Sequence, residues 1–313
     1  MKDIEKMQPE ISFIVPVYNV ADYLPQCLES LLAVPVCKEI ILVDDGSTDG
    51  SAQIAQAFFR LHSEIILLQQ HNSGVSAARN RGLSVARGRY VQFVDGDDFL
   101  LAQTRYPELI AYADARQIDV VKTLILGTKQ DGTPFLARLP TVSIGSDKDG
   151  VICSGEDYLR TFLGNWFPAI WNGFCRTEIL RQHHIQFEET IRNSEDAIFT
   201  VDLLSVPDIR VLEAKVVTYA YRHRDNSASH NDWVRIFGRV CEAAQIIGKR
   251  AQRFAADSPM FDLLMSVMTL EYLIAYDRYY RTFNAEQRAL VWHYFLPDVV
   301  DLMRKRSTML IEL

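Results

Sequence analysis

The sequence predicts an α/β protein built on a Rossmann-like, mainly parallel central sheet flanked by helices, with a C-terminal helical extension. Four short apolar runs rich in β-branched residues alternate with three segments of helical apolar spacing within the first 95 residues, and this alternation is typical of βα units with a parallel sheet. The runs carry no polar alternation, as expected for strands buried on both faces. From Asp232 onward, a segment rich in Tyr, Phe and Leu favours helices to the end of the chain.

The expected elements follow one another in a regular order. In the first part of the chain we expect strands at 11–18, 39–43, 64–70 and 90–95 and helices at 22–33, 49–60 and 73–86. Beyond these we expect a helix and then a strand within 104–126, a hairpin at 127–135, a polar loop at 141–155, an irregular aromatic segment at 166–176, a helix at 195–205 and a strand at 210–222. Right-handed crossovers between parallel strands place the carboxyl ends of the first four strands along one edge of the sheet.

Composition excludes several classes of protein. The net charge of −7 over 313 residues argues against nucleic acid as an electrostatic partner, because phosphate contacts need a basic face. Five widely spaced cysteines without a CxxC pair indicate reduced thiols in a cytoplasmic protein. The charged N-terminus MKDIEKMQPE lacks the apolar run of a signal peptide, and no apolar stretch is long enough to span a membrane.

One segment departs from the acidic average of the chain. Residues 222–253 carry seven Lys or Arg against three acids. A basic patch beside aromatic helices could hold the protein at the anionic inner face of the cell membrane. The same helices could instead form an oligomer interface or pack internally, and internal packing is the interpretation we favour from the sequence.

Polar clusters follow each of the first four strands, at the edge where α/β sheets bind ligands. These clusters are Tyr18-Asn19, Asp44-Asp45-Gly46-Ser47, Asn72-Ser73-Gly74 and Asp95-Gly96-Asp97. The alternative interpretation is that they are ordinary polar loops. No G-x-G-x-x-G turn and no Walker loop is present, so a bound nucleotide would be held by carboxylates and side-chain amides.

The acidic cluster in YVQFVDGDDFL predicts a metal site. Asp95 and Asp97, separated by a glycine, can offer hard oxygen ligands to Mg²⁺ or Mn²⁺, which keeps further positions for water and diphosphate oxygens. Gly96 lets the backbone come close to the ligand. The alternative is an acidic turn in which Asp98 caps a following helix.

The order of motifs resembles family 2 glycosyltransferases of the GT-A fold. VDDGSTD at 43–49, NSGVSAARNRG at 72–82 and DGDD at 95–98 carry this resemblance, with weaker matches to about residue 230. The resemblance implies a nucleoside-diphosphate sugar donor, usually with Mn²⁺ or Mg²⁺, and inversion at the anomeric carbon. It also implies a catalytic domain at 1–230, with a nucleotide-sugar half at 10–100 and an acceptor half at 101–230, and a helical region at 231–313.

The resemblance assigns roles to the strand-end residues. Asp44 and Asp45 would face the uracil and the ribose, and Asp95 and Asp97 would be the metal ligands, with Asp97 the principal one. The remaining nucleotide-sugar residues that the resemblance implies are Pro16, Tyr18, Asn19, Asn72, Gly74, Arg79 and Gly96. The alternative for Arg79 is an exposed charge on a helix.

An inverting transfer needs a general base for the acceptor hydroxyl. RNSEDAIF resembles the ED motif of the family, with Asp196 as base and Glu195 in support, at a helix N-terminus that favours ionised carboxylates. Ser194 stands where the family usually has glycine. The alternative is that Ser194 caps the helix and both acids complement its dipole.

A later stretch, YRHRDNSASH at 221–230, resembles a family segment that closes over the diphosphate. Arg222, Arg224 and Ser227 would then stabilise the leaving group; the alternative is a solvated basic loop. Trp166 and Trp171 could stack on acceptor sugars or belong to the core.

The sequence therefore predicts an inverting, metal-dependent glycosyltransferase. It would move a hexose or N-acetylhexosamine from a UDP-sugar to a glycan or lipid-linked acceptor during synthesis of capsule, O-antigen or exopolysaccharide. A nucleotidyltransferase is the enzymatic alternative, but it would normally carry a basic glycine-rich loop near the N-terminus. The other alternative is a sugar-nucleotide-binding protein without catalysis, which would be expected to lack Asp97 or Asp196.

Overall fold

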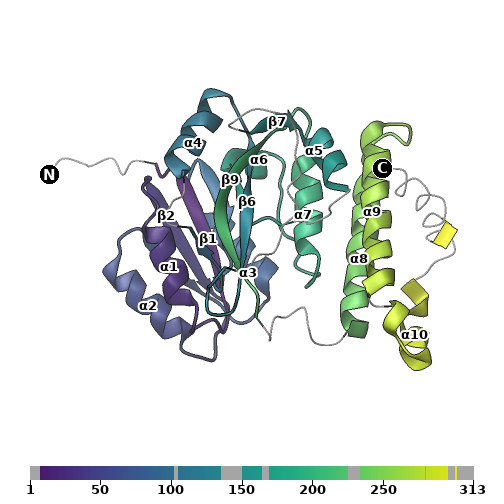
Figure 1. Cartoon of the computed structure of the whole chain (residues 1–313), viewed down its shortest axis with the longest axis horizontal. Helices are drawn as coiled ribbons and strands as arrows, with labels where there is room; N and C mark the ends of the chain where they lie inside the picture. Colours follow the sequence, from purple (N-terminus) through teal and green to yellow (C-terminus); the bar gives the residue numbers. More distant parts are fainter. Residues whose placement is uncertain are drawn as a thin grey trace. The chain divides into compact units, whose positions relative to one another are not determined.

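The computed structural model describes residues 8–101, 105–134, 150–163, 169–224, 233–278, 280–294 and 300–301. The chain forms two compact units (Figure 1). The sheet unit comprises 1–153, 170–187 and 209–224, and the helical unit comprises 154–169, 188–208 and 225–313. The helical unit therefore draws two of its segments from within 101–230, in addition to the C-terminal region.

Four parallel strands form one half of the sheet, as the sequence predicts. They are β1 (Ile11–Val17), β2 (Lys38–Asp44), β3 (Ile65–Gln69) and β4 (Tyr90–Phe93), in the order β3-β2-β1-β4. Helices α1 (Leu24–Leu32), α2 (Ser51–Leu61) and α3 (Val75–Val85) connect them. Val17 is paired with Asp44, and Asp44 with Gln69, so the strands end in register and their following loops share one edge.

The other half of the sheet mixes strand directions. It contains β8 (Gly173–Arg176), β6 (Val120–Thr128), β9 (Arg210–Arg222) and β5 (Phe99–Leu100), with β7 (Val151–Ser154) also pairing with β9. β8 runs antiparallel to both β4 and β6, whereas β6 and β9 are parallel. Helices α4 (Tyr106–Ala115) and α6 (Thr177–Gln182) complete the unit.

Most expected elements of this half are confirmed, and three differ. The helix and strand within 104–126 correspond to α4 and β6, and the strand at 210–222 is β9. A Thr128–Pro134 bridge closes the predicted hairpin. β8 lies inside the segment predicted to be irregular, β7 lies inside the predicted polar loop, and β5 follows the acidic cluster where a helix was an alternative. All three strands are short, and strands of two to four residues carry too little periodicity to be detected.

The helical unit is built around two long helices. It contains α5 (Gly155–Phe162), α7 (Glu195–Leu204), α8 (Trp233–Ala251), α9 (Pro259–Arg278), α10 (Ala285–Val291) and the short 3₁₀ turns η3 (Tyr280–Thr282) and η4 (Trp292–Tyr294). The buried ring of Phe237 contacts the rings of Tyr280, Phe283 and Tyr294. These aromatic residues are therefore part of the packing of the unit. Within the described residues, no helix is both long and apolar enough to cross a membrane.

Candidate active site

The loops after β1 and β2 are joined by side-chain hydrogen bonds. Asn19, in a left-handed conformation (φ 52°), accepts a hydrogen bond from the backbone N–H of Thr48 at 2.8 Å. Ser51 Oγ, at the start of α2, accepts one from the N–H of Val20 at 2.9 Å. Tyr18, the residue before Asn19, is 47% exposed. The first polar cluster thus exposes an aromatic ring at the sheet edge. Its loop is held in place by the hydrogen bonds to the loop after β2 and to the start of α2.

Asp45 holds the beginning of helix α3. Its buried carboxylate accepts three hydrogen bonds of 2.8 Å, from Gln70 Nε2 and the N–H of Ser73 on Oδ1 and from the N–H of Gly74 on Oδ2. Asp44, also buried, accepts from the N–H of Ser47 at 3.1 Å. Both carboxylates therefore organise the loops of this edge, and their contact with uracil and ribose stays a prediction.

Two glycines shape the same loops. Gly74 precedes α3 with φ 95°, and Gly46 has φ 74°, a region that disfavours other residues. A Cβ on Gly46 would lie 3.0 Å from the backbone nitrogen of Asn72. The side chain of Asn72 itself is exposed. The second and third polar clusters therefore approach each other at backbone distance.

Arg79 is a buried partner of the acidic cluster. From α3 its Nη2 reaches Asp95 Oδ1 at 2.8 Å, and its guanidinium lies 5.1 Å from the centre of the Phe187 ring. Its side chain is 4% exposed, whereas that of Asp95 is 26% exposed. The alternative of an exposed helix charge is wrong, because the arginine is held inside the unit by a carboxylate.

Asp97 is paired with a second arginine. Arg224 Nη2 lies 2.5 Å from Asp97 Oδ2, and the side chains are 24% and 16% exposed respectively. Burial, followed by the nearby Asp95 carboxylate, raises the pKa of Asp97, while Arg224 acts in the opposite direction. Each of the two carboxylates that the sequence assigns to metal binding thus has its own arginine.

Asp98 does not cap a helix, so that alternative is wrong. The next residues form β5, and the following helix begins only at Tyr106. Asp98 is buried and accepts two hydrogen bonds of 2.7 Å, from the hydroxyl of Tyr219 and from the N–H of Arg222. Burial, with the charges of Asp97 and Asp95, raises its pKa well above the usual range.

Arg222 is enclosed by internal partners. Its Nε donates to the Asp97 carbonyl at 2.7 Å, and its terminal nitrogens donate to the Gln130 carbonyl and to Gln26 Oε1 at 2.6 and 2.5 Å. The side chain is buried, so the description as a solvated basic loop is wrong for Arg222. Here the guanidinium fixes the turn that carries Asp97, and its contact with a diphosphate stays a prediction.

Gly96 sits where a side chain would be crowded. A Cβ at this position would lie 3.1 Å from both the Pro16 carbonyl oxygen and Val20 Cγ2. The acidic turn is therefore packed against the end of β1, and Pro16 lies next to the acidic cluster.

The helical unit carries the predicted base residues. Glu195 and Asp196 are half-buried and open helix α7. Ser194 occupies the position before the helix with φ 61°, and its side chain makes no capping hydrogen bond. The capping alternative is thus wrong for its side chain. The left-handed backbone also explains why glycine would suit this position.

Of the two tryptophans that could stack on acceptor sugars, Trp171 lies within the described residues and Trp166 does not. Trp171 is buried and stacks against the rings of Tyr219 and Tyr221, with centroid distances of 4.5 and 5.1 Å. It is therefore a core residue. Trp166 and Ser227 lie outside the described residues.

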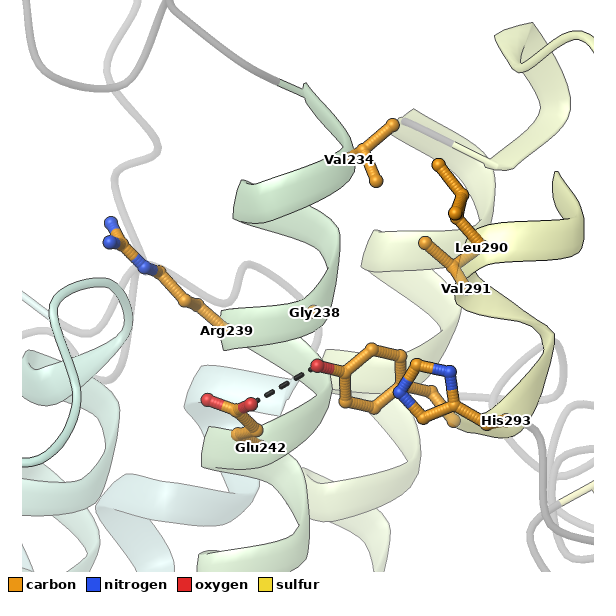
Figure 2. A pocket seen from close by; sticks show the side chains of 8 residues that line it. Val234, Gly238, Arg239, Glu242, Leu290, Val291 and His293 are labelled. Atoms are coloured by element: carbon orange, nitrogen blue, oxygen red, sulfur yellow. Dashed lines mark hydrogen bonds between the residues drawn. The ribbon is translucent and has the colours of Figure 1, made fainter. Parts of the chain in front are cut away.

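A small pocket of about 320 Å³ opens in the helical unit beside α8 (Figure 2). Its apolar side is formed by Val234, Leu290 and Val291, and its polar side includes Glu242, which accepts a hydrogen bond from the Tyr294 hydroxyl at 3.1 Å. Arg239 also lines the pocket. The Nη1 atom of this arginine donates to Asn193 Oδ1 at 3.2 Å, two residues before Glu195. Arg239 thus links the pocket to the loop that precedes the predicted base.

Comparison with known proteins identifies the family. Residues 12–161 match the model of "Glycosyl transferase family 2". Residues 12–161 belong to this family. The matched region contains all four polar clusters of the sheet edge.

Two relatives match a larger share of the chain than the family model does. The chain is 30% identical over 224 residues to "Uncharacterized glycosyltransferase EpsJ" of Bacillus subtilis (strain 168), covering 71% of this chain and 63% of EpsJ. It is 33% identical over 198 residues to "Uncharacterized glycosyltransferase YibD" of Escherichia coli (strain K12), covering 62% of this chain and 56% of YibD. The chain therefore spans less than two thirds of the length of either relative.

Solved structures identify the fold as GT-A. Crystal structures of Staphylococcus aureus TarS 1-349 with UDP and with UDP-GlcNAc have TM-scores of 0.75 and 0.76 to this chain. Each is 21% identical and covers 96% of this chain and 83% of that chain. The mixed sheet with its parallel β3-β2-β1-β4 half thus has the GT-A fold, as the sequence predicts.

The donor atoms of the acidic turn fit a divalent cation. Asp95 and Asp97 supply the hard carboxylate oxygens that Mg²⁺ and Mn²⁺ prefer. Among the described residues, no group of three His, Cys, Asp or Glu side chains could hold a metal by itself, so further ligands would come from diphosphate and water. A more distant structural neighbour, mannosyltransferase PcManGT of Pyrobaculum calidifontis, was solved with GDP-Man and Mn²⁺; its TM-score is 0.58 at 15% identity, covering 97% of this chain and 84% of that chain.

Sequence reasoning about this family member missed two residues that shape the site. Tyr219 lies in the middle of a strand and Gln26 on a helix, and neither belongs to a motif. Tyr219 contacts Asp98 and the backbone of Asp95, and Gln26 holds Arg222. For Tyr219, the one available signal is its place in the apolar strand β9. A hydroxyl group in such a strand is expected to be buried and therefore to need a hydrogen-bond partner.

Proposed function

We propose that this chain transfers a hexose or N-acetylhexosamine from a UDP-sugar to a glycan or lipid-linked acceptor in the synthesis of bacterial surface polysaccharide, with inversion at the anomeric carbon. Membership of glycosyltransferase family 2 gives the reaction class. The observation that carries the proposal is the sheet edge itself, where two arginine-paired carboxylates, Asp95 and Asp97, follow β4 beside the glycine-shaped loops of β1 to β3.

Uridine is the base that we propose for the donor. TarS, whose fold this chain shares, was crystallised with UDP and with UDP-GlcNAc. In this chain, the exposed Tyr18 ring offers a surface on which a base can stack. Asp45 offers carboxylate oxygens to the uracil imide and ribose hydroxyls if its loop bonds rearrange. Asn19, Asn72 and Gly74 complete the rim of this pocket.

The diphosphate would be held by the acidic turn and the arginines. A divalent cation bound by Asp97 and Asp95 supplies charge neutralisation for the diphosphate leaving group. Arg224, half-buried beside Asp97, would stabilise the negative charge that develops as the bond between the anomeric carbon and the diphosphate oxygen breaks. Arg79 and Arg222 keep the turn in place.

Asp196 is the general base in this proposal. It would accept the proton of the acceptor hydroxyl while the acceptor oxygen bonds to the anomeric carbon and UDP leaves. Its place in the first turn of α7 favours the ionised form that a base requires. Glu195 would support it by binding acceptor hydroxyls.

For the acceptor, we infer a role of the pocket beside α8. Sugar ligands are bound by combinations of ring faces and charged hydrogen-bonding groups, and the pocket offers Tyr294, His293, Glu242 and Arg239. Because Arg239 also contacts Asn193, an acceptor in this pocket would act on the loop that precedes the base.

We also propose contact with the inner face of the cell membrane. The basic surface available for this contact is smaller than the sequence suggests, because most of the basic residues are paired within the protein. Within 222–253, five of the seven basic residues have a described polar partner: Arg222, Arg224, Arg239, Arg250 and Arg253. Sedimentation with anionic liposomes at low salt and release at high salt would support this contact, and equal recovery in the supernatant at both salts would contradict it.

The proposed reaction is tested by a donor panel. The protein is incubated with Mn²⁺ and individual UDP- and GDP-sugars, and release of nucleotide is measured. We expect slow hydrolysis of one UDP-sugar even without acceptor, and an inverted anomeric configuration in the transferred product by NMR. Nucleotide release from a GDP-sugar alone would contradict the uridine assignment.

A further inference from the structure

The contact between Arg224 and Asp97 limits how a cation can bind. Arg224 Nη2 lies 2.5 Å from Asp97 Oδ2, so the guanidinium already occupies a ligand position of that oxygen. A divalent cation on the same oxygen would stand within a few ångströms of a positive guanidinium in a partly buried site, where charge repulsion is strong. The two cations therefore exclude each other at Asp97 in this geometry.

The two arginines that are paired with the Asp95 and Asp97 carboxylates differ in how firmly they are held. Arg79 is buried on a helix, with its side chain 4% exposed and packed over Phe187. Arg224 lies beyond the end of β9, and its side chain is 24% exposed. Its other contact among the described residues is the Tyr23 ring, 5.4 Å from the guanidinium carbon. Arg224 is thus the arginine that can leave its carboxylate at low cost.

The charges of the turn indicate where Arg224 goes. Three carboxylates and three guanidinium groups meet there: Asp95, Asp97, Asp98, Arg79, Arg222 and Arg224. A divalent cation added to this balanced set leaves an excess of positive charge, and a nucleoside diphosphate supplies the matching negative charge. A released guanidinium beside a diphosphate forms charge-assisted hydrogen bonds.

We propose that Arg224 is a built-in competitor of the divalent cation for Asp97, and that binding of cation and UDP moves Arg224 from Asp97 to the diphosphate. This inference rests on the proposed function, because it takes the cation and the diphosphate from it. It makes Arg224 the residue that couples the two ligands: the cation alone binds weakly, and the cation with UDP binds well.

The test measures Mn²⁺ binding without any turnover. Free Mn²⁺ is followed by electron paramagnetic resonance for the wild type, Arg224→Gln and Arg224→Ala. Loss of the competitor should tighten Mn²⁺ binding about two- to fivefold without nucleotide, the range expected from removing a partly exposed ion pair. With UDP present the order should reverse, because these variants lack the guanidinium that binds the diphosphate.

Two control variants separate this effect from a change in net charge. Arg224→Lys keeps the positive charge and should bind Mn²⁺ as weakly as the wild type. Arg60→Gln removes one charge from the last turn of α2, which leads into β3. In the sheet, β2 and β1 separate β3 from β4 and its acidic turn, so this variant should leave Mn²⁺ affinity unchanged at physiological salt.

The outcomes are distinct. Equal or weaker Mn²⁺ binding by both Arg224→Gln and Arg224→Ala overturns the competition, as does absence of Mn²⁺ binding in every variant. If the variants behave as expected but no sugar nucleotide is ever cleaved, the proposed function fails while the competition stands. If UDP is released normally and Mn²⁺ affinity does not change when Arg224 is replaced, the competition fails while the proposed function stands.

Discussion

Tyr219 joins two residues of the acidic turn through a single hydroxyl group. It donates to Asp98 Oδ2 at 2.7 Å and accepts from the backbone N–H of Asp95 at 3.2 Å. The tyrosine is fully buried in β9, so a strand from the second half of the sheet fixes the turn that follows β4. The position of the proposed metal ligands therefore depends on a residue outside every motif.

Replacing Tyr219 by Phe should destabilise the protein by about 1–3 kcal/mol, because the buried Asp98 carboxylate loses a donor. Mn²⁺ affinity should fall as well, since the backbone of Asp95 loses its anchor. Urea denaturation and Mn²⁺ titration measure the two effects. Tyr276→Phe, at a 41% exposed position of α9, is the matched control, and an equal loss of stability in both variants would show that the buried contact has no special weight.

Gly96→Ala tests the close packing of the acidic turn on β1. The added Cβ would meet two atoms at 3.1 Å, and overpacking of this kind costs about 1–3 kcal/mol. UDP affinity in the presence of Mn²⁺ should fall with it. At Gly50 a Cβ meets its nearest neighbour at 3.6 Å, an ordinary contact, so Gly50→Ala should change UDP affinity little. Wild-type UDP affinity in Gly96→Ala would refute the packing argument.

Ser194→Gly should stabilise the helical unit by about 0.5–1 kcal/mol, since glycine adopts the left-handed backbone at φ 61° without steric cost. Ser205, at the other end of α7, has φ −86°, and glycine there should destabilise by a similar amount. Thermal unfolding compares the pair. Destabilisation by both substitutions would mean that the conformation of Ser194 carries no strain.

Arg239→Ala tests whether the pocket beside α8 binds the acceptor. We expect KM for the acceptor to rise several-fold while the affinities for Mn²⁺ and UDP stay unchanged, because Arg239 contacts only the base loop and the pocket among the described residues. Lys249→Ala, at an exposed position of the same helix, removes the same charge. A rise in KM of the same size in Lys249→Ala would indicate a general charge effect instead.

The sequence predicts the parallel strands and the polar residues at their ends well, because the patterns that indicate them lie within short stretches of chain. The parallel half of the sheet and the polar strand ends follow from apolar runs and from the residues directly after them, and the motif order leads to the family. The second half of the site depends on contacts across long stretches of chain. Asp98 meets Tyr219 from 121 residues away, and no periodicity of the intervening chain encodes that pairing.

The charges of the site show the same difference. The sequence indicates that the crowded carboxylates need a positive partner, and a metal ion is the partner it favours. The structure adds Arg79 and Arg224 as partners. Residue spacing could not identify Arg224 as the partner of Asp97, because this contact depends on where the end of β9 lies relative to the turn after β4. The grouping of α5 and α7 with the C-terminal helices likewise reflects three-dimensional packing.

The most direct test of the central claim compares Asp97→Asn and Asp196→Asn in one experiment. UDP binding in the presence of Mn²⁺ is measured by calorimetry, and sugar transfer to acceptor is measured with the UDP-sugar that the donor panel identifies. We predict that Asp97→Asn loses Mn²⁺-dependent UDP binding and transfer together, whereas Asp196→Asn binds UDP like the wild type and loses transfer by at least about a hundredfold, as expected for a general base. Wild-type transfer by either variant would contradict the account.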